Sequence, residues 1–354
     1  MTTRRVRDTD LPDAGRGRRG VGLGLALTVV VAAPVALLLS WPQAVRAERL
    51  PVVAQLIAFR PVLAIALLVG AALCTLIALA RRRWSIAAAM AVVLVAAAGT
   101  NAAVLLARGG AVLEAGVVSE GEGEGEGDLT VLAWNTLGGA ASPQSIAQLV
   151  IETDADIVSL PETDEAAVTE VARLVALEGK TMTADTTRGA DGDSAIPTSV
   201  LISAELGDYR HDADAGSTPD LPSGVWEPVD GTGPRIVAAH PLPPLPGMFG
   251  QWSAGLDWVT DHCTEPDVIV AGDLNATIDH FGARLDGCRD AALQSGGAAS
   301  GTWPASAPVW LASPIDHVLV GSAWEVRAAS VITSSDGAGS DHRPIVAVVS
   351  PAAR

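Results

Sequence analysis

The stretch Val268-Ile-Val-Ala-Gly-Asp-Leu-Asn-Ala-Thr277 decides how the rest of this sequence is interpreted. Its run of β-branched residues predicts a buried strand, because such side chains suit a crowded, pleated surface. Gly272 then permits a turn, and the two-residue spacing of Asp273 and Asn275 places both side chains on one side of an extended chain. Such a pair suits a divalent cation, a phosphate oxygen or an attacking water. An Asx-type turn without chemistry is the alternative, and the stretch alone favours that turn.

Charge divides the 354-residue chain into two unlike parts. Residues 1–127 contain 13 Arg, no Lys and nine acidic residues, which gives a net charge of +4. Residues 128–354 carry a net charge of −21. The sequence therefore predicts an apolar, mildly basic front and an acidic back that is long enough for a globular domain.

Three apolar runs in the front part are long enough to cross a bilayer, which needs about 20 helical residues: 21–40, 61–80 and 84–107. Arginines crowd residues 4–19 before the first run, and Arg81-Arg82-Arg83 separates the second run from the third. The positive-inside rule places both basic clusters in the cytoplasm. The first connection and everything after the third run are then outside the cell membrane. Arg46, Arg49 and Arg60 in that connection reduce the charge contrast.

These features predict four segments: a basic cytoplasmic tail (1–20), three transmembrane helices within 21–108, a Gly/Glu linker (109–127) and an extracytoplasmic globular domain (128–354). A cleavable signal peptide is a weaker interpretation of the first run, because two more apolar runs follow. The alternating Gly and Glu of residues 121–127 predict a flexible, solvated linker.

Three cysteines are compatible with this arrangement. Cys74 lies within the second apolar run, where a small packing role is expected. Cys263 and Cys288 both lie in the outer domain, where a disulfide persists if it forms. The sequence leaves a bridge and two free thiols as equal alternatives, because their separation in space is not encoded in their spacing.

The outer domain alternates strand and helix patterns, which predicts an α/β fold with two sheets and helices outside them. The expected strands are 129–134, 157–160, 198–203, 235–239, 268–271, 315–320, 325–332 and 344–349, and the expected helices are 142–151, 166–177 and 252–262. Polar residues suited to catalysis recur where these strands end: Asn135, Glu162, His240, Asp273, Asn275, Asp316, Asp341 and His342. Strand ends on one rim are where α/β scaffolds build active sites, so we expect these residues to meet.

In this order, these residues resemble the endonuclease/exonuclease/phosphatase family of metal-dependent phosphoesterases related to DNase I and exonuclease III. The matching pieces are Trp134-Asn135-Thr136, Leu160-Pro161-Glu162, His240-Pro241, Gly272-Asp273-Leu274-Asn275, Ile315-Asp316-His317 and Ser340-Asp341-His342. Pro161 and Leu274 stand where the family more often has Gln and Phe. The resemblance implies that the outer domain is catalytic. It also implies a four-layer α/β sandwich with two mixed sheets, preceded here by the all-α transmembrane region.

The resemblance also implies a cofactor, Mg²⁺ or Mn²⁺, because hard cations take oxygen ligands. Glu162 would be its main ligand, and Asn135 and Asp341 would complete or flank the metal site. Capping of the following helix is the alternative role for Glu162.

Catalytic roles follow from the same resemblance. His342 would accept a proton from the attacking water or bind the phosphate, with Asp316 orienting its ring. Asp273 would position the water or leaving group, and Asn275 would hold a phosphate oxygen. His240 would donate to the phosphate or leaving oxygen, unless it merely ends a strand before Pro241.

Asp316 and His317 compete for one role. Period-2 alternation puts their side chains on opposite faces of a strand, and the family match favours Asp316 for the site. Trp303 has two open interpretations, lining the site or packing.

Charge argues against a nucleic-acid substrate, because nucleic-acid binding depends on Lys and Arg and the outer domain has one Lys and nine Arg. Membrane attachment favours a partner in the membrane, either a lipid-linked phosphate of the undecaprenyl pyrophosphate type or a phospholipid. The chain resembles the membrane-anchored actinobacterial branch of the family, the VanJ-type teicoplanin-resistance proteins. An outward-facing nuclease and a non-catalytic wall- or lipid-binding protein are the alternatives. The sequence indicates no protein partner.

Overall fold

The fold is that of a computed structural model, which describes residues 14–81, 86–110, 112–113, 127–187 and 196–353. Most of the predicted tail, Arg82 and Arg83 of the second basic cluster, and linker residues 114–126 lie outside the described residues.

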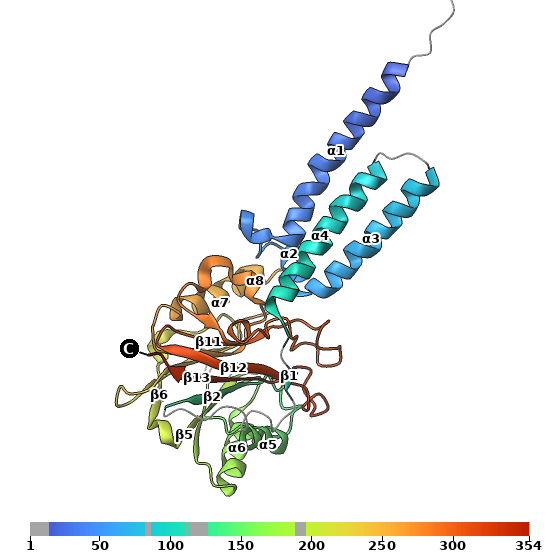
Figure 1. The fold of residues 1–354 in the computed structure, drawn as a ribbon. Coiled ribbons are helices and arrows are strands. Elements are labelled where there is room, and N and C mark those ends of the chain that lie inside the picture. The colour runs from blue at the N-terminus through green and yellow to red at the C-terminus, as the bar shows by residue number, and fades with distance from the viewer. Residues whose placement is uncertain (1–13, 82–85, 111, 114–126, 188–195, 354) are drawn as a thin grey trace, which may run out of the picture.

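Three long helices project together from one end of the molecule (Figure 1): α1 (Ala14–Ser40), α3 (Arg60–Arg81) and α4 (Ile86–Arg108). Within the described residues, Arg60–Ala80 and Ile86–Arg108 are long and apolar enough to cross a membrane. The apolar part of α1 that was searched, Thr28–Ser40, is shorter than a span. Two of the three predicted spans therefore meet the length and composition of a membrane helix.

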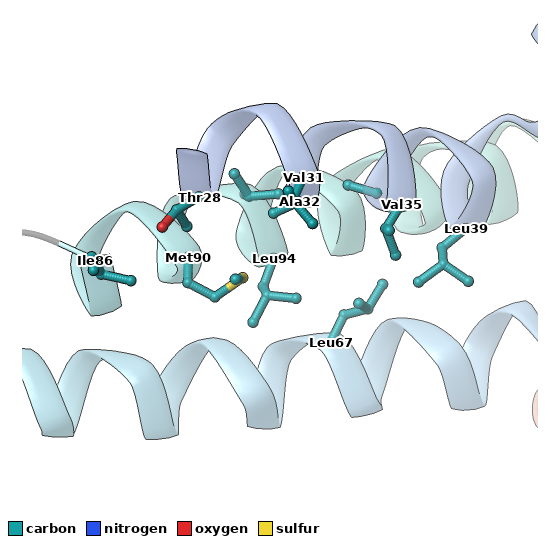
Figure 2. Close-up of a pocket in the computed structure, with 11 residues that line it drawn as sticks. Thr28, Val31, Ala32, Val35, Leu39, Leu67, Ile86, Met90 and Leu94 are labelled. Atoms are coloured by element: carbon teal, nitrogen blue, oxygen red, sulfur yellow. The ribbon is translucent and has the colours of Figure 1, made fainter. Parts of the chain in front are cut away.

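Helix α4 packs against both α1 and α3, and a cleft of about 470 Å³ remains between them. Figure 2 shows Val35 and Leu39 of α1 facing Leu94 of α4 and Leu67 of α3 across this cleft. Its lining is almost wholly apolar.

The connection between α1 and α3 is folded. It contains the short helices η1 (Pro42–Val45) and α2 (Val53–Ala58), and Ala54 and Ile57 of α2 are buried. Ala54 belongs to the apolar cluster on the outer face of one sheet of the domain that follows α4. The connection between the first two predicted spans is therefore not a free loop. Its residues 41–59 pack on the domain and are called the docking segment.

Two mixed sheets form the domain after α4. In the described residues the first has the strand order β1-β12-β13-β2-β3-β5-β4: β1 (Val112–Leu113), β2 (Leu129–Ala133), β3 (Ile157–Pro161), β4 (Met182–Thr186), β5 (Thr198–Ser203), β12 (Trp324–Ile332) and β13 (Ile345–Pro351). The second has the order β10-β11-β9-β8-β7-β6: β6 (Tyr209–His211), β7 (Gly224–Pro228), β8 (Arg235–Ala239), β9 (Val268–Asp273), β10 (Arg289–Asp290) and β11 (Asp316–Val320). Strand β1 lies inside the predicted linker and pairs in parallel with β12.

Side-chain alternation divides the packing into layers. On β2, Val131 faces the core between the sheets and Leu132 faces the opposite side. The outer face of the first sheet is covered by α5 (Pro143–Glu152) and α6 (Glu165–Leu177). The outer face of the second is covered by α7 (Phe249–His262) and α8 (Ile278–Phe281). The order helices, sheet, sheet, helices confirms the predicted α/β fold with two mixed sheets.

Helix α7 begins three residues before its predicted start at Trp252. The amide of Trp252 donates to the carbonyl of Met248, so the preceding turn is already helical. The cysteines at the end of α7 and before β10, Cys263 and Cys288, form a disulfide with Cα atoms 5.2 Å apart.

A buried ion cluster joins the long helices to the α/β domain. The carboxylate of Asp279 in α8 accepts two hydrogen bonds of 2.7 Å from Arg60 and two of 2.8 Å from Arg108. Arg60 also donates to the carbonyl of Ser40 and to the side chain of Asn101 in α4. Burial alone would raise the pKa of Asp279, but the two guanidinium groups outweigh burial and lower it. The ends of α1, α3 and α4 are therefore fixed to one carboxylate.

A second contact uses Arg49, whose guanidinium bonds Asp257 of α7 at 2.5 Å and the carbonyl of His280 at 2.9 Å. Arg49 and Arg60 reduced the charge contrast in the sequence. Their partners show that they serve docking.

Replacing Asp279 by Asn should leave Arg60 and Arg108 buried without an anion. We expect the free energy of unfolding to fall by about 3–5 kcal/mol, as when a buried ion pair loses one partner. Chemical unfolding of the full-length protein in detergent measures this change.

Asp257→Asn is the matched control, because the side chain of Asp257 is 55% exposed and its ion pair is worth about 0–1 kcal/mol. Equal losses for the two variants would contradict the assignment of Asp279 as the buried clamp.

Candidate active site

Strands β9 and β11 bring the first two carboxylates together. They pair antiparallel with Asp273, the last residue of β9, opposite Asp316, the first residue of β11. Gly272 is required here, because its φ is +148° and a Cβ would lie 2.1 Å from the carbonyl oxygen of Ala239.

The next residue, His317, points to the other face. Its Nδ1 lies 2.6 Å from Asp290 Oδ2, and its Nε2 lies 2.8 Å from the carbonyl oxygen of Ala276. Both ring nitrogens are thus engaged away from the rim. The two side chains therefore lie on opposite faces, as alternation predicts, and Asp316, which the family resemblance favoured, is the one on the rim with His342.

His342 sits between the two carboxylates. Its Nδ1 is 2.9 Å from Asp316 Oδ2, and its Nε2 is 3.7 Å from Asp273 Oδ2. The turn before β13 is fixed by Ser340, which donates to the carbonyl of Asn135 at 2.6 Å and accepts from the His342 amide at 3.0 Å. Sequence reasoning quoted Ser340 without giving it this role.

Asn135 bridges the two sheets. Its amide nitrogen lies 3.0 Å from Glu162 Oε1 and 3.0 Å from Asp273 Oδ2. Glu162 has φ +60°, a conformation uncommon for residues other than Gly, and the Thr136 hydroxyl donates to its carbonyl. The cap of α6 is Asp164, so Glu162 is left to the site.

His240 completes the inner wall. Its Nε2 lies 3.8 Å from Glu162 Oε1 and 3.8 Å from Asp273 Oδ2, and its amide donates to the Ser223 hydroxyl. Burial and the positive charge of His342 lower the pKa of His240 to about 3. Its imidazole is therefore neutral at physiological pH.

Asn275 lies next to the carboxylate of Asp273. Its amide N–H donates to Asp273 Oδ1 at 2.8 Å, and its side chain donates to the carbonyl of Pro241 at 3.0 Å. This geometry combines an Asx-type turn with a position at the rim, so the two interpretations of the stretch are compatible.

Asp341 lies at the mouth, with a side chain that is 43% exposed. Its Oδ2 accepts from the indole N–H of Trp303 at 2.9 Å, and its Oδ1 is 3.9 Å from His342 Nε2. The ring of Trp303 is centred 6.4 Å from the His342 ring. Trp303 therefore lines the mouth of the site.

The charges of His342 and Asp273 depend on each other. Burial opposes the charged imidazole of His342, but the carboxylates of Asp316 and Asp273 raise its pKa to about 10. Burial raises the pKa of Asp273 to about 7, although the charge of His342 opposes this rise. A protonated His342 thus faces a carboxyl group that titrates near neutral pH.

The donor set fits a hard divalent cation. Asp273 and Asp316 offer carboxylate oxygens, and one atom of each lies within 4.8 Å of the other and of a ring nitrogen of His342, which is not a ligand while the ring is protonated. Asp316 Oδ1 and Asp341 Oδ1 are buried atoms without a hydrogen-bond partner. Glu162 and Asn135, the other predicted ligands, are joined to this group through Asp273. All eight predicted site residues therefore share one rim, whereas the disulfide lies on the outer face of the second sheet.

Two supporting residues gave no sequence signal. Ser223 holds the backbone of His240, and Thr302 accepts from the amide of Asp316 at 3.2 Å. Each stands in a loop, and only the fold brings it to the rim.

Comparison with known proteins agrees with the fold. A family model described as "Endonuclease/Exonuclease/phosphatase family" matches residues 132–342. No curated protein matches the sequence.

Solved structures with a similar fold include a humanized TDP2 of D. rerio, with 16% identity, a TM-score of 0.49, and coverage of 63% of this chain and 98% of that one. An endonuclease/exonuclease/phosphatase from Beutenbergia cavernae has 19% identity, a TM-score of 0.49, and coverage of 64% and 72%. The human Nocturnin catalytic domain with bound sulfate has 18% identity, a TM-score of 0.45, and coverage of 64% and 95%. Identities this low say nothing about substrate.

Asp316→Asn should lower the pKa of His342 from about 10 by about 1–3 pH units, because the nearest anion is lost. A raised histidine pKa stabilises the fold fully below pH 6.5, and this contribution is lost as pH rises through about 10. In the variant, the free energy of unfolding should decrease less over this pH range. NMR titration of labelled histidines in the full-length protein measures the pKa.

Asp290→Asn is the control, because it removes the partner of His317 and leaves the pair of His342 intact. A His342 pKa that moves as much in the control as in Asp316→Asn would refute the pairing.

Proposed function

The chain belongs to the endonuclease/exonuclease/phosphatase family, whose members hydrolyse phosphate esters, and on that premise we propose a metal-dependent phosphoesterase that acts on a lipid-linked phosphate at the outer face of the cell membrane. The preferred substrate is an undecaprenyl pyrophosphate-type lipid or a phospholipid. The resemblance to the VanJ-type branch is part of this proposal.

One observation carries the choice of a lipid: the site mouth touches the segment that leads into α3. Phe59, directly before Arg60, has its ring centred 6.0 Å from the ring of Trp303. Trp303 in turn donates to Asp341 and lies beside His342. A phosphate that entered this mouth would stand next to the membrane helices.

Charge supports the same choice. The domain from residue 128 onwards carries a net charge of −21, with one Lys and nine Arg. A nucleic-acid backbone needs many cationic contacts, whereas a single lipid phosphate needs only those of the site.

The docking segment supports the proposed arrangement of three spans. Residues 41–59 and the catalytic domain contact each other, so both lie on one side of the bilayer. The end of α3 and the start of α4 are then on the opposite side, which is the side that the positive-inside rule assigns to Arg81-Arg82-Arg83.

A cation held by Glu162, Asn135 and Asp341 would supply positive charge for the phosphoryl oxygens. Asp273, whose pKa is near 7, is the side chain placed to take a proton from the attacking water. His342 is held as an imidazolium, which suits binding a phosphoryl oxygen better than accepting a proton. Neutral His240 retains one N–H for the leaving oxygen. Water adds to phosphorus as the bond to the leaving oxygen breaks, Asp273 takes the proton lost by the water, and the leaving oxygen, hydrogen-bonded to His240, takes a proton from solvent.

The test compares phosphate release from undecaprenyl pyrophosphate with nicking of a plasmid, each with Mg²⁺ and with EDTA. We expect Mg²⁺-dependent release from the lipid and no nicking. His342→Ala should lower lipid hydrolysis by about 10²–10³-fold, because a positioned charged donor to the phosphoryl oxygen is lost.

His211→Ala is the matched control, since His211 is exposed on β6, outside the site. Nicking without lipid hydrolysis would favour a nuclease, and inactivity on every phosphoester would favour a binding protein. Full activity of His342→Ala would refute the site.

A further inference from the structure

An apolar groove of about 540 Å³ opens where α3 and α4 meet the catalytic domain. One wall is formed by Pro61 at the start of α3 and by Leu105 and Leu106 in the last turn of α4. The other wall is formed by Val309 and Trp310. None of the described residues that line the groove is charged.

Both walls continue directly to the candidate site. On the first wall, Pro61 lies two residues after Phe59. On the second wall, Trp310 belongs to the same loop as Trp303. A hydrogen bond from the Gly301 amide to the Val309 carbonyl closes this loop. Phe59 and Trp303 contact each other, with ring centroids 6.0 Å apart, and Trp303 bonds Asp341. The Phe59–Trp303 contact thus links the two segments that line the groove to the mouth of the site.

The groove lies at the height where the long helices end. Leu106 is 84% exposed and Trp310 is 60% exposed, although both are large and apolar. Trp favours the boundary between hydrocarbon and head groups. An apolar surface at this level is suited to lipid rather than water.

We propose that this groove binds the hydrocarbon chain next to the phosphate of a lipid substrate, while the phosphate occupies the candidate site. The hydrocarbon chain of the lipid enters laterally from the bilayer, between the end of α4 and Trp310. This inference rests on the proposed function and adds how the enzyme selects a membrane substrate over a soluble phosphate.

Gly110 allows a direct test, because it lines the groove and tolerates a side chain. A Cβ at Gly110 would meet Ser300 Oγ at 3.5 Å, an ordinary contact, whereas neighbouring Gly109 has φ +62° and a Cβ there would lie 2.1 Å from the Gly296 carbonyl oxygen. Gly110→Phe should therefore fill the groove without straining the chain. Gly250→Phe is the matched control, since a Cβ at this exposed residue of α7 meets nothing within 4 Å.

The assay compares undecaprenyl pyrophosphate in detergent micelles with isopentenyl pyrophosphate, which has the same head group on a five-carbon chain. Gly110→Phe should lower kcat/KM for the long chain at least about tenfold, which is the effect of excluding about two methylene groups. Hydrolysis of the short chain should stay within about twofold, and Gly250→Phe should change neither.

Equal losses on the two substrates, or no loss on either, would overturn the groove assignment. Trp310→Ser is the second variant in case Gly110→Phe does not fold, and it should show the same split. Wild-type turnover of the long chain tests the proposed function separately. If the wild type hydrolyses neither pyrophosphate, that function fails and the groove assignment fails with it. If the wild type hydrolyses the long-chain pyrophosphate but the groove variants do not lose more activity on it than on the short-chain one, the groove assignment alone fails.

Discussion

The relation between the long N-terminal helices and the α/β domain depends on one buried carboxylate. Asp279 accepts four hydrogen bonds from Arg60 and Arg108, and Arg60 reaches on to Ser40 and Asn101. Removing the carboxylate would leave two guanidinium groups buried without an anion. The free energy of the folded arrangement therefore depends strongly on Asp279. The same clamp sets where Phe59 lies, and through Phe59 it sets the neighbour of Trp303 at the mouth of the site. The orientation of the site towards the helices is thus built into the fold.

Within the site, burial and charge separate residues of one chemical type into different roles. His342 is flanked by Asp316 and Asp273 and is held charged, whereas His240 is buried beside that charge and is held neutral. Asn135 ties Glu162 of one sheet region to Asp273 of the other. Catalytic groups with opposed pKa shifts are what acid–base chemistry at neutral pH requires. This pattern supports the proposed hydrolysis of a phosphate ester, with the cation as the expected source of further positive charge.

Local pattern predicted much of the domain and of its rim. Alternation along a strand predicted that Asp316 and His317 face opposite sides, and the family resemblance selected Asp316 for the site. The two-residue spacing after Gly272 predicted that Asp273 and Asn275 lie on a common side. Contacts between distant segments could not be predicted. Helix α2 is only six residues long, too short for a periodic pattern, and its docking depends on partners about 200 residues away. In the sequence, Arg60 only weakened the charge contrast on which the positive-inside rule depends. Its partner could not be recognised, because the carboxylate that pairs with it lies far away in α8. Strand β1 was likewise not predicted within the linker, because it is defined by its pairing with the distant strand β12.

The central claim is that a site clamped beside its own membrane helices acts on lipid in its own bilayer. Reconstitution of the full-length protein into vesicles tests this claim most directly. Undecaprenyl pyrophosphate is placed either in the vesicles that hold the protein or in separate protein-free vesicles, at equal total concentration with Mg²⁺. We expect phosphate release from lipid in the protein's own vesicles and almost none from the separate vesicles. Equal rates from both populations would contradict it.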